Sequence, residues 1–399
     1  MLAATTRVTG DLDVAEECVQ DAYIAALTAW ARDGIPRKPG AWLTATAKRK
    51  ALDILRRERV FRSKMPLLVE PAEDVTDHFG SDAVPDDRLR LIFTCCHPTL
   101  TREAQVALTL RLVCGVATPD IARSFLVSET TMAARVTRAK KKISAARIPY
   151  RVPDVAELPQ RLDAVLTVIH LLYTTGHTAP SGADLVRADL VDRSLHLARM
   201  LLALMPDEPE VRGLLALLLL TDARRATRTD AEGRLLVLED QDRSAWDRAA
   251  IGEGRRLSID AFRTGRVGRY ALQAAIASLH ANAETYAATD WRQVVRLYDE
   301  LSRVWPSPVV ALNRAVAVSM VDGPRAALDE VEALERDDRL AGYHYLAAVR
   351  ADLLRRLGRH REAVTAYRTA RDLADNEPER AFLAARLTES SAAAEAAGD

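Results

Sequence analysis

The stretch TPDIARSFLVSETTMAARVTRAKKKI, residues 118–143, contains two short helical segments joined by a tight connection. Thr118-Pro119-Asp120 places a capping residue and an early proline where a helix begins. Ser128 caps a second segment, and the apolar positions that follow it have the spacing of one helix face. These positions are Met132, Val136, Ala139 and Ile143. The pattern predicts a helix-turn-helix.

The other face of the second segment is polar and basic, as a DNA-reading helix requires. The candidate DNA-binding residues on it are Ser128, Thr130, Thr131, Arg135, Arg138, Lys141 and Lys142. In this motif the first residues enter the major groove and the later lysines lie over phosphates. Two features depart from the usual pattern. Leu126 occupies a turn position where glycine is common, at a cost of ~1 kcal/mol. Ala133 and Ala134 stand where longer side chains often read bases, so base specificity is expected to rest on Thr130, Thr131 and Arg135 or to be weak. A helical hairpin with charged ends stays an alternative to DNA binding.

A second basic segment lies earlier in the chain, at residues 42–64. Its first part, 42–59, has a helical apolar stripe formed by Leu43, Ala47, Ala51 and Ile54. Its cations are Lys48, Arg49, Lys50, Arg56, Arg57, Arg59, Arg62 and Lys64, opposed by Asp53 and Glu58. Such a cluster suits a phosphate backbone, because each contact releases condensed counterions. A solvated charged face is the alternative.

Acidic segments flank this basic helix. Residues 11–30 have the spacing of a helix whose buried face carries Leu12, Ala15, Val19, Ala22 and Ala26. Its other face is acidic, with Asp11, Asp13, Glu16, Glu17 and Asp21. Two prolines predict a loop at 34–40. An acidic, proline-containing stretch at 65–86 predicts a linker.

Composition favours an all-α chain with more than one domain. The 399 residues include 17 Gly and 17 Pro, and Lys+Arg and Asp+Glu both number 56. The four cysteines lack CxxC spacing, which fits a reducing cytoplasm, and the Cys95-Cys96-His97 run favours buried thiols over a metal site. The apolar run at 214–220 is far shorter than the ~20 residues of a membrane span, so we expect a core helix.

The C-terminal part contains a blurred helical repeat. Val294, Tyr298 and Leu301 align with Ala327, Val331 and Leu334, and then with Ala363, Tyr367 and Ala370. The steps are 33 residues (294 to 327) and 36 residues (327 to 363), and glycines at 323 and 358 stand just before the later units. This resembles tetratricopeptide repeats, in which each unit is a helical hairpin. A generic helical bundle is the alternative.

The order of these pieces resembles an extracytoplasmic-function sigma factor. The segment GDLDVAEECVQDAY (10–23) is similar to the family's polymerase-docking helix, 42–59 to its minus-ten helix, and 119–143 to its minus-thirty-five motif. FTCCHP (93–98) and the long helical extension resemble one subgroup. The implied organisation is sigma domain two at 1–64, the linker at 65–86, sigma domain four at 87–148, and the extension at 160–399.

The resemblance also implies residue roles. Core RNA polymerase would contact Asp13, Glu16, Gln20 and Asp21. The loop 34–40 with Trp42 would lie near a base flipped out of the melted strand. Extruding a base costs a few kcal/mol, so a pocket and backbone contacts are needed to stabilise it. The melted minus-ten strand would contact Lys48, Arg49, Asp53, Arg56 and Arg57. The acidic helix begins close to the first residue, so the helix that precedes it in the family is expected to be absent or very short.

The function expected is promoter-specific initiation with core RNA polymerase, in the cytoplasm, modulated by an extension that binds a protein or peptide. No phosphate loop, HExxH or nucleophile elbow is present in the sequence, so we expect no enzyme, cofactor or metal. Two alternatives stay open: a helix-turn-helix regulator with a sensor domain, and a tetratricopeptide-like scaffold. A regulator would bind duplex DNA without polymerase.

Overall fold

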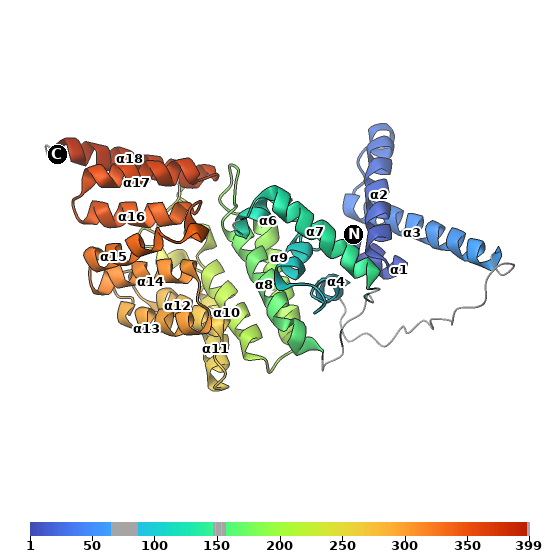
Figure 1. The fold of residues 1–399 in the computed structure, drawn as a ribbon, viewed down its shortest axis with the longest axis horizontal. Helices are drawn as coiled ribbons and strands as arrows, with labels where there is room; N and C mark the ends of the chain where they lie inside the picture. The colour runs from blue at the N-terminus through green and yellow to red at the C-terminus, as the bar shows by residue number, and fades with distance from the viewer. Residues whose placement is uncertain (65–86, 126, 147, 149–152, 154–156, 397–399) are drawn as a thin grey trace. The chain divides into compact units, whose positions relative to one another are not determined.

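The fold of the described chain is helical throughout. The computed structural model describes residues 1–399 except 65–86, 126, 147, 149–152, 154–156 and 397–399, with only the backbone for 58–64 and 87–88. Within these limits every regular element is a helix, apart from two isolated β-bridges (Figure 1). The all-α prediction is confirmed. Contacts divide the chain into two compact units: the first comprises Met1–Ala122 and Val127–Val168, and the second comprises Arg123–Leu126 and Ile169–Asp399.

The first three helices form the N-terminal part of the first unit: α1 (Leu2–Thr9), α2 (Leu12–Asp33) and α3 (Pro39–Lys64). The N-cap Asp11 accepts hydrogen bonds from two backbone N–H groups of the first turn of α2. Alanines fill much of the contact between α2 and α3, and Ala22 and Ala47 are fully buried there. The loop predicted at 34–40 is wrong in its last two residues, because Pro39 begins α3. A proline suits this position, where its missing N–H would have no partner within the helix.

Four shorter helices follow, of which the last two are the predicted helix-turn-helix: α4 (Asp87–Cys95), α5 (Arg102–Leu112), α6 (Thr118–Ser124) and α7 (Glu129–Ala145). The predicted apolar stripe of α7 is buried, and Met132 is fully so. All four cysteines are buried free thiols. Burial raises the pKa of Cys96 to about 12, so this thiol is inert at neutral pH.

The main part of the second unit begins within α8 (Leu158–His177) and continues through α9 (Ala188–Leu204), α10 (Pro209–Asp222), α11 (Arg248–Arg263) and α12 (Arg269–Asn282). Helix α10 contains the apolar run 214–220 and is a core helix, as predicted. Gly213 allows α10 to approach α12 closely, because a Cβ there would lie 2.5 Å from the backbone nitrogen of Ala271. None of the described helices has both the length and the apolar character that a membrane crossing needs.

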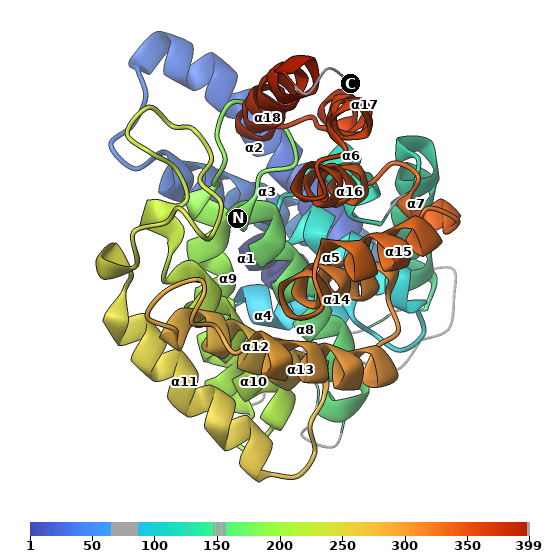
Figure 2. The same ribbon diagram turned by 90° about the vertical axis from the view of Figure 1, so that its left-hand side faces the viewer.

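The repeat region forms antiparallel hairpins from α13 (Trp291–Val304), α14 (Pro308–Val321), α15 (Pro324–Leu334), α16 (His344–Arg356), α17 (His360–Leu373) and α18 (Glu377–Ala396). Both views show these helices following one another in chain order along a stack (Figures 1 and 2). The aligned repeat positions Val294, Ala327 and Ala363 are all fully buried between neighbouring helices. Gly323 and Gly358 adopt positive φ at the tight turns before α15 and α17.

Histidines with lowered pKa values in the second unit lead us to expect that this unit loses stability in mild acid. Burial and the Arg269 guanidinium lower the pKa of His170 to about 4, whereas an unfolded histidine has a pKa of about 6.5. Between these values the unfolded chain binds the proton and the folded chain does not, so stability falls as the pH falls. At pH 5 this amounts to about 2 kcal/mol for His170. We expect His170→Gln to reduce the drop in melting temperature between pH 7.5 and 5, and His196→Gln, at an exposed position, to leave it unchanged.

Candidate nucleic-acid interface

The start of α7 presents a compact set of hydroxyl groups. The Oγ of Ser128 accepts a hydrogen bond from the Thr131 N–H at 3.3 Å, which caps the helix. The same Oγ lies 3.1 Å from the Thr130 hydroxyl and 2.8 Å from that of Thr131. All three residues are exposed. Ser128 therefore has a capping role in addition to the DNA contact predicted for it.

The cations predicted on α7 lie along its outward side. Arg138, Lys141 and Lys142 are exposed, and Arg135 is half-buried. The structure thus brings all seven helix-turn-helix residues predicted from the sequence onto one helix and its cap. The exposed Ala133 and Ala134 add little reach to this face. Leu126, the expected turn position, lies outside the described residues.

The basic helix α3 presents its predicted cations over its middle turns. Arg49, Asp53, Arg56 and Arg57 are exposed, and Lys48 is half-buried. Lys50 pairs instead with Asp21 of α2 at 2.9 Å. The side chains of Arg59, Arg62 and Lys64 lie outside the described part.

Trp42, at the beginning of α3, is half-buried. It packs edge-on against Trp30 of α2, with ring centroids 5.6 Å apart. This contact holds the start of α3 against α2. A hollow beside it is lined in part by Tyr23, Thr44 and Lys48. An aromatic ring, a hydroxyl and a cation thus gather next to the end of the 34–40 loop.

The acidic residues predicted to contact polymerase fall into two groups. Asp13 and Gln20 are exposed. Glu16 and Asp21 are half-buried, and each pairs with a lysine of the same unit, Lys140 and Lys50 respectively. These two carboxylates therefore also hold elements of the first unit together.

An exposed apolar strip on α2 escaped the sequence analysis. Tyr23, Ile24 and Leu27 are 53%, 63% and 77% exposed. Large apolar side chains clustered on one helix face and left in solvent mark an interaction surface. The sequence did contain one indication of this strip: its residues lie beside the buried stripe that includes Ala22 and Ala26, and not within it.

Family comparisons agree with this arrangement. Residues 2–60 match the model of sigma-70 region 2, and residues 90–143 match that of sigma-70 region 4. The chain belongs to the extracytoplasmic-function sigma factors that carry a C-terminal extension. Residues 161–262 of this sigma factor match a family of unknown function, DUF6596.

A bacterial relative shares nearly the whole length of this sigma factor. It is the uncharacterized protein R00370 of Rhizobium meliloti (strain 1021), 44% identical over 391 residues. The alignment covers 97% of this chain and 92% of that protein, so the extension is part of the similarity. No solved structure matches the chain. Its two sigma domains assign it to promoter-specific transcription with RNA polymerase, and these domains belong to families of regulators rather than enzymes.

Proposed function

We propose that this sigma factor binds core polymerase and two promoter elements through three separate surfaces of the first unit. It acts in the cytoplasm and catalyses no reaction of its own. The α2 surface, with Asp13, Gln20, Ile24 and Leu27, binds core polymerase. The basic middle of α3 holds the melted minus-ten strand, and α7 reads the minus-thirty-five duplex. The observation that carries this proposal is the exposure of Ile24 and Leu27 beside the acidic residues of α2.

Charge and chemistry distinguish the two DNA surfaces. Helix α3 offers cations at Arg49, Arg56 and Arg57, which suit the backbone of a single strand. The hollow lined by Tyr23 and Lys48 has the stacking ring and the charge that an extruded base uses. Helix α7 offers short hydroxyl groups at its first turn and cations further along, the order expected of a helix that enters the major groove by its N-terminal end.

We further propose that the extension modulates this activity by binding a protein or peptide. Stacked helical hairpins form extended surfaces that serve such binding. The hairpins of α13 to α18 provide one in the second unit.

In vitro transcription with core polymerase tests both proposals separately. The full chain plus core enzyme should give promoter-specific transcripts, and neither should do so alone. A variant that ends at residue 177 retains all of α8, including Arg161, which donates a hydrogen bond to the Phe93 carbonyl at 3.0 Å. Its output should differ from that of the full chain by at least about threefold, ~0.7 kcal/mol. Equal output would refute modulation and leave the sigma function standing; no transcript from either chain would refute the sigma function.

A further inference from the structure

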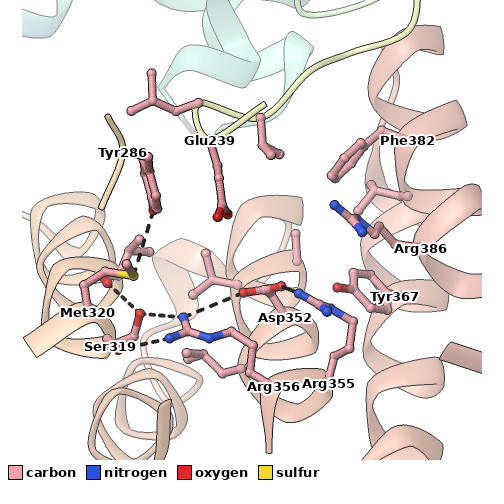
Figure 3. A pocket seen from close by; sticks show the side chains of 17 residues that line it. Glu239, Tyr286, Ser319, Met320, Asp352, Arg355, Arg356, Tyr367, Phe382 and Arg386 are labelled. Carbon is pink, nitrogen blue, oxygen red and sulfur yellow. Dashed lines mark hydrogen bonds and ion pairs between the residues drawn. The ribbon is translucent and has the colours of Figure 1, made fainter. Parts of the chain in front are cut away.

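Among the described residues of the second unit are two hollows of the size that small molecules occupy. The larger, of about 470 Å³, lies between the loop at Glu239 and helices α14, α16 and α18 (Figure 3). Three of its charged side chains already have partners within the lining: Asp352 accepts a hydrogen bond from Arg355 at 2.6 Å, and Arg356 donates one to the Ser319 hydroxyl at 2.8 Å. A charged ligand in this hollow would compete with those pairs.

The second cavity, of about 340 Å³, combines apolar walls with polar groups that lack an ionic or hydrogen-bond partner among the described residues. Helices α10, α12, α13 and α14 and the segment that carries Trp246 surround it. Apolar side chains form most of the wall, among them Leu220, Trp246, Ile276 and Leu301. A volume above about 300 Å³, apolar walls and a few convergent polar groups are the usual features of a small-molecule site.

Arg224, just after α10, is the cation of this cavity. It is half-buried, and its Nη1 donates a hydrogen bond to Gln241 Oε1 at 3.4 Å. No carboxylate of a described residue lies within ion-pair distance of it. The adjacent Arg225 shows the contrast, because it pairs with Asp222 at 2.7 Å and with Asp192 at 2.9 Å. Partial burial of a guanidinium without an anion costs free energy, and this burial lowers the pKa of Arg224.

The groups around Arg224 also favour an anion in the cavity. Arg243 lies near enough to lower the pKa of Arg224 further, and it donates to two backbone carbonyls at the end of α12. His280 also lines the cavity, and its Nδ1 is buried without a hydrogen-bond partner among the described residues. Burial and the two arginines lower the pKa of His280 to about 4, so the ring is neutral at pH 7. A neutral ring can still hydrogen-bond a ligand.

We propose that the extension binds a small organic carboxylate with an apolar body in this cavity. The carboxylate would lie against Arg224, whose planar guanidinium suits a two-oxygen anion. The body would pack among Trp246, Ile276 and Leu301, with His280 beside it. This inference goes beyond the proposed transcription function, because binding requires neither polymerase nor promoter.

Calorimetric titration of the full-length protein at pH 7.5 tests the proposal with defined probes. Phenylacetate and octanoate carry the proposed chemistry; phenylacetamide and octanamide keep the apolar body and lack the charge; inorganic phosphate has the charge alone. We expect saturable one-site binding of at least one carboxylate. Its amide should bind at least tenfold more weakly, and phosphate should not bind.

Two variants and a control locate the site. Arg224→Gln should weaken carboxylate binding at least tenfold and leave amide binding unchanged. Ala277→Phe, which fills the cavity from α12, should abolish both, whereas Arg255→Gln on the exposed side of α11 should change neither. Thermal melts confirm that each variant is folded. The proposal is overturned if neither carboxylate binds, if amide or phosphate binds as tightly as the carboxylate, or if both cavity variants bind as the unaltered protein does.

Discussion

The double substitution Ile24→Asp and Leu27→Asp is expected to lower the affinity for core RNA polymerase by more than about 100-fold. Both side chains lie on the exposed strip of α2, at 63% and 77% exposure. Burying an apolar side chain of this size in an interface contributes about 1.5–3 kcal/mol, and each ~1.4 kcal/mol is tenfold in affinity. Two aspartates in place of two apolar anchors also introduce charges that must lose their water on docking.

The fold should survive this change, because neither side chain belongs to the core between α2 and α3. Affinity is measured by titrating fluorescently labelled protein with core enzyme. Ile259→Asp is the matched control, since this isoleucine is 44% exposed on α11 of the extension. The proposed docking surface is refuted if the double variant, with an unchanged melting temperature, keeps full affinity.

The same strip shows where periodicity in the sequence misleads. On α2 the small residues Ala22 and Ala26 are buried, while the larger Ile24 and Leu27 stay in solvent. Apolar spacing identifies the helix and its buried stripe correctly. Spacing alone does not show whether the remaining apolar residues pack against another part of the chain or stay exposed for a binding partner. The outcome depends on the close packing of α2 against α3 through alanines, which leaves Ile24 and Leu27 outside the contact.

Local patterns predicted the DNA-binding elements well for a physical reason. The cap at Ser128 and the stripe beginning at Met132 involve residues at most a few turns apart, so their spacing alone determines the outcome. The ion pairs Lys50–Asp21 and Lys140–Glu16 join residues 29 and 124 positions apart, and no spacing rule encodes them. The first pair gives Lys50, one of the cations of the basic segment 42–64, a structural partner instead of a phosphate, and the second pair gives Lys140 a structural partner that the sequence analysis did not consider. The assignments of individual residues to DNA or polymerase stay predictions.

The cavity around Arg224 was beyond reach of the sequence for the same reason. Its wall and its polar groups come from five separate segments, from α10 to α14, and nothing in the sequence distinguishes Arg224 from its neighbour Arg225. Only the fold shows that Arg225 has carboxylate partners and that Arg224 has none among the described residues. The sequence had identified the extension as stacked hairpins, and therefore suggested a peptide-binding surface rather than an enclosed ligand site.

Charge reversal on α3, by Arg56→Glu with Arg57→Glu, is expected to reduce promoter-specific transcription by about 30-fold, or ~2 kcal/mol. Both arginines are exposed, so the folded chain should tolerate the change. Each reversal removes one phosphate contact and adds repulsion from the backbone. Because fewer counterions are released, output should also fall less steeply as salt is raised. Binding of core polymerase should stay unchanged, which separates this effect from that of the α2 variants.

The matched control for this experiment is Arg255→Glu with Arg256→Glu, an adjacent exposed pair on α11. It makes the same change in net charge at a distant place in the sequence, so a general electrostatic effect would appear in both variants. A loss confined to the α3 pair assigns the effect to DNA held by that helix. If the α3 pair transcribes as well as the control at every salt concentration, the basic middle of α3 is a solvated surface and the minus-ten strand must be held elsewhere.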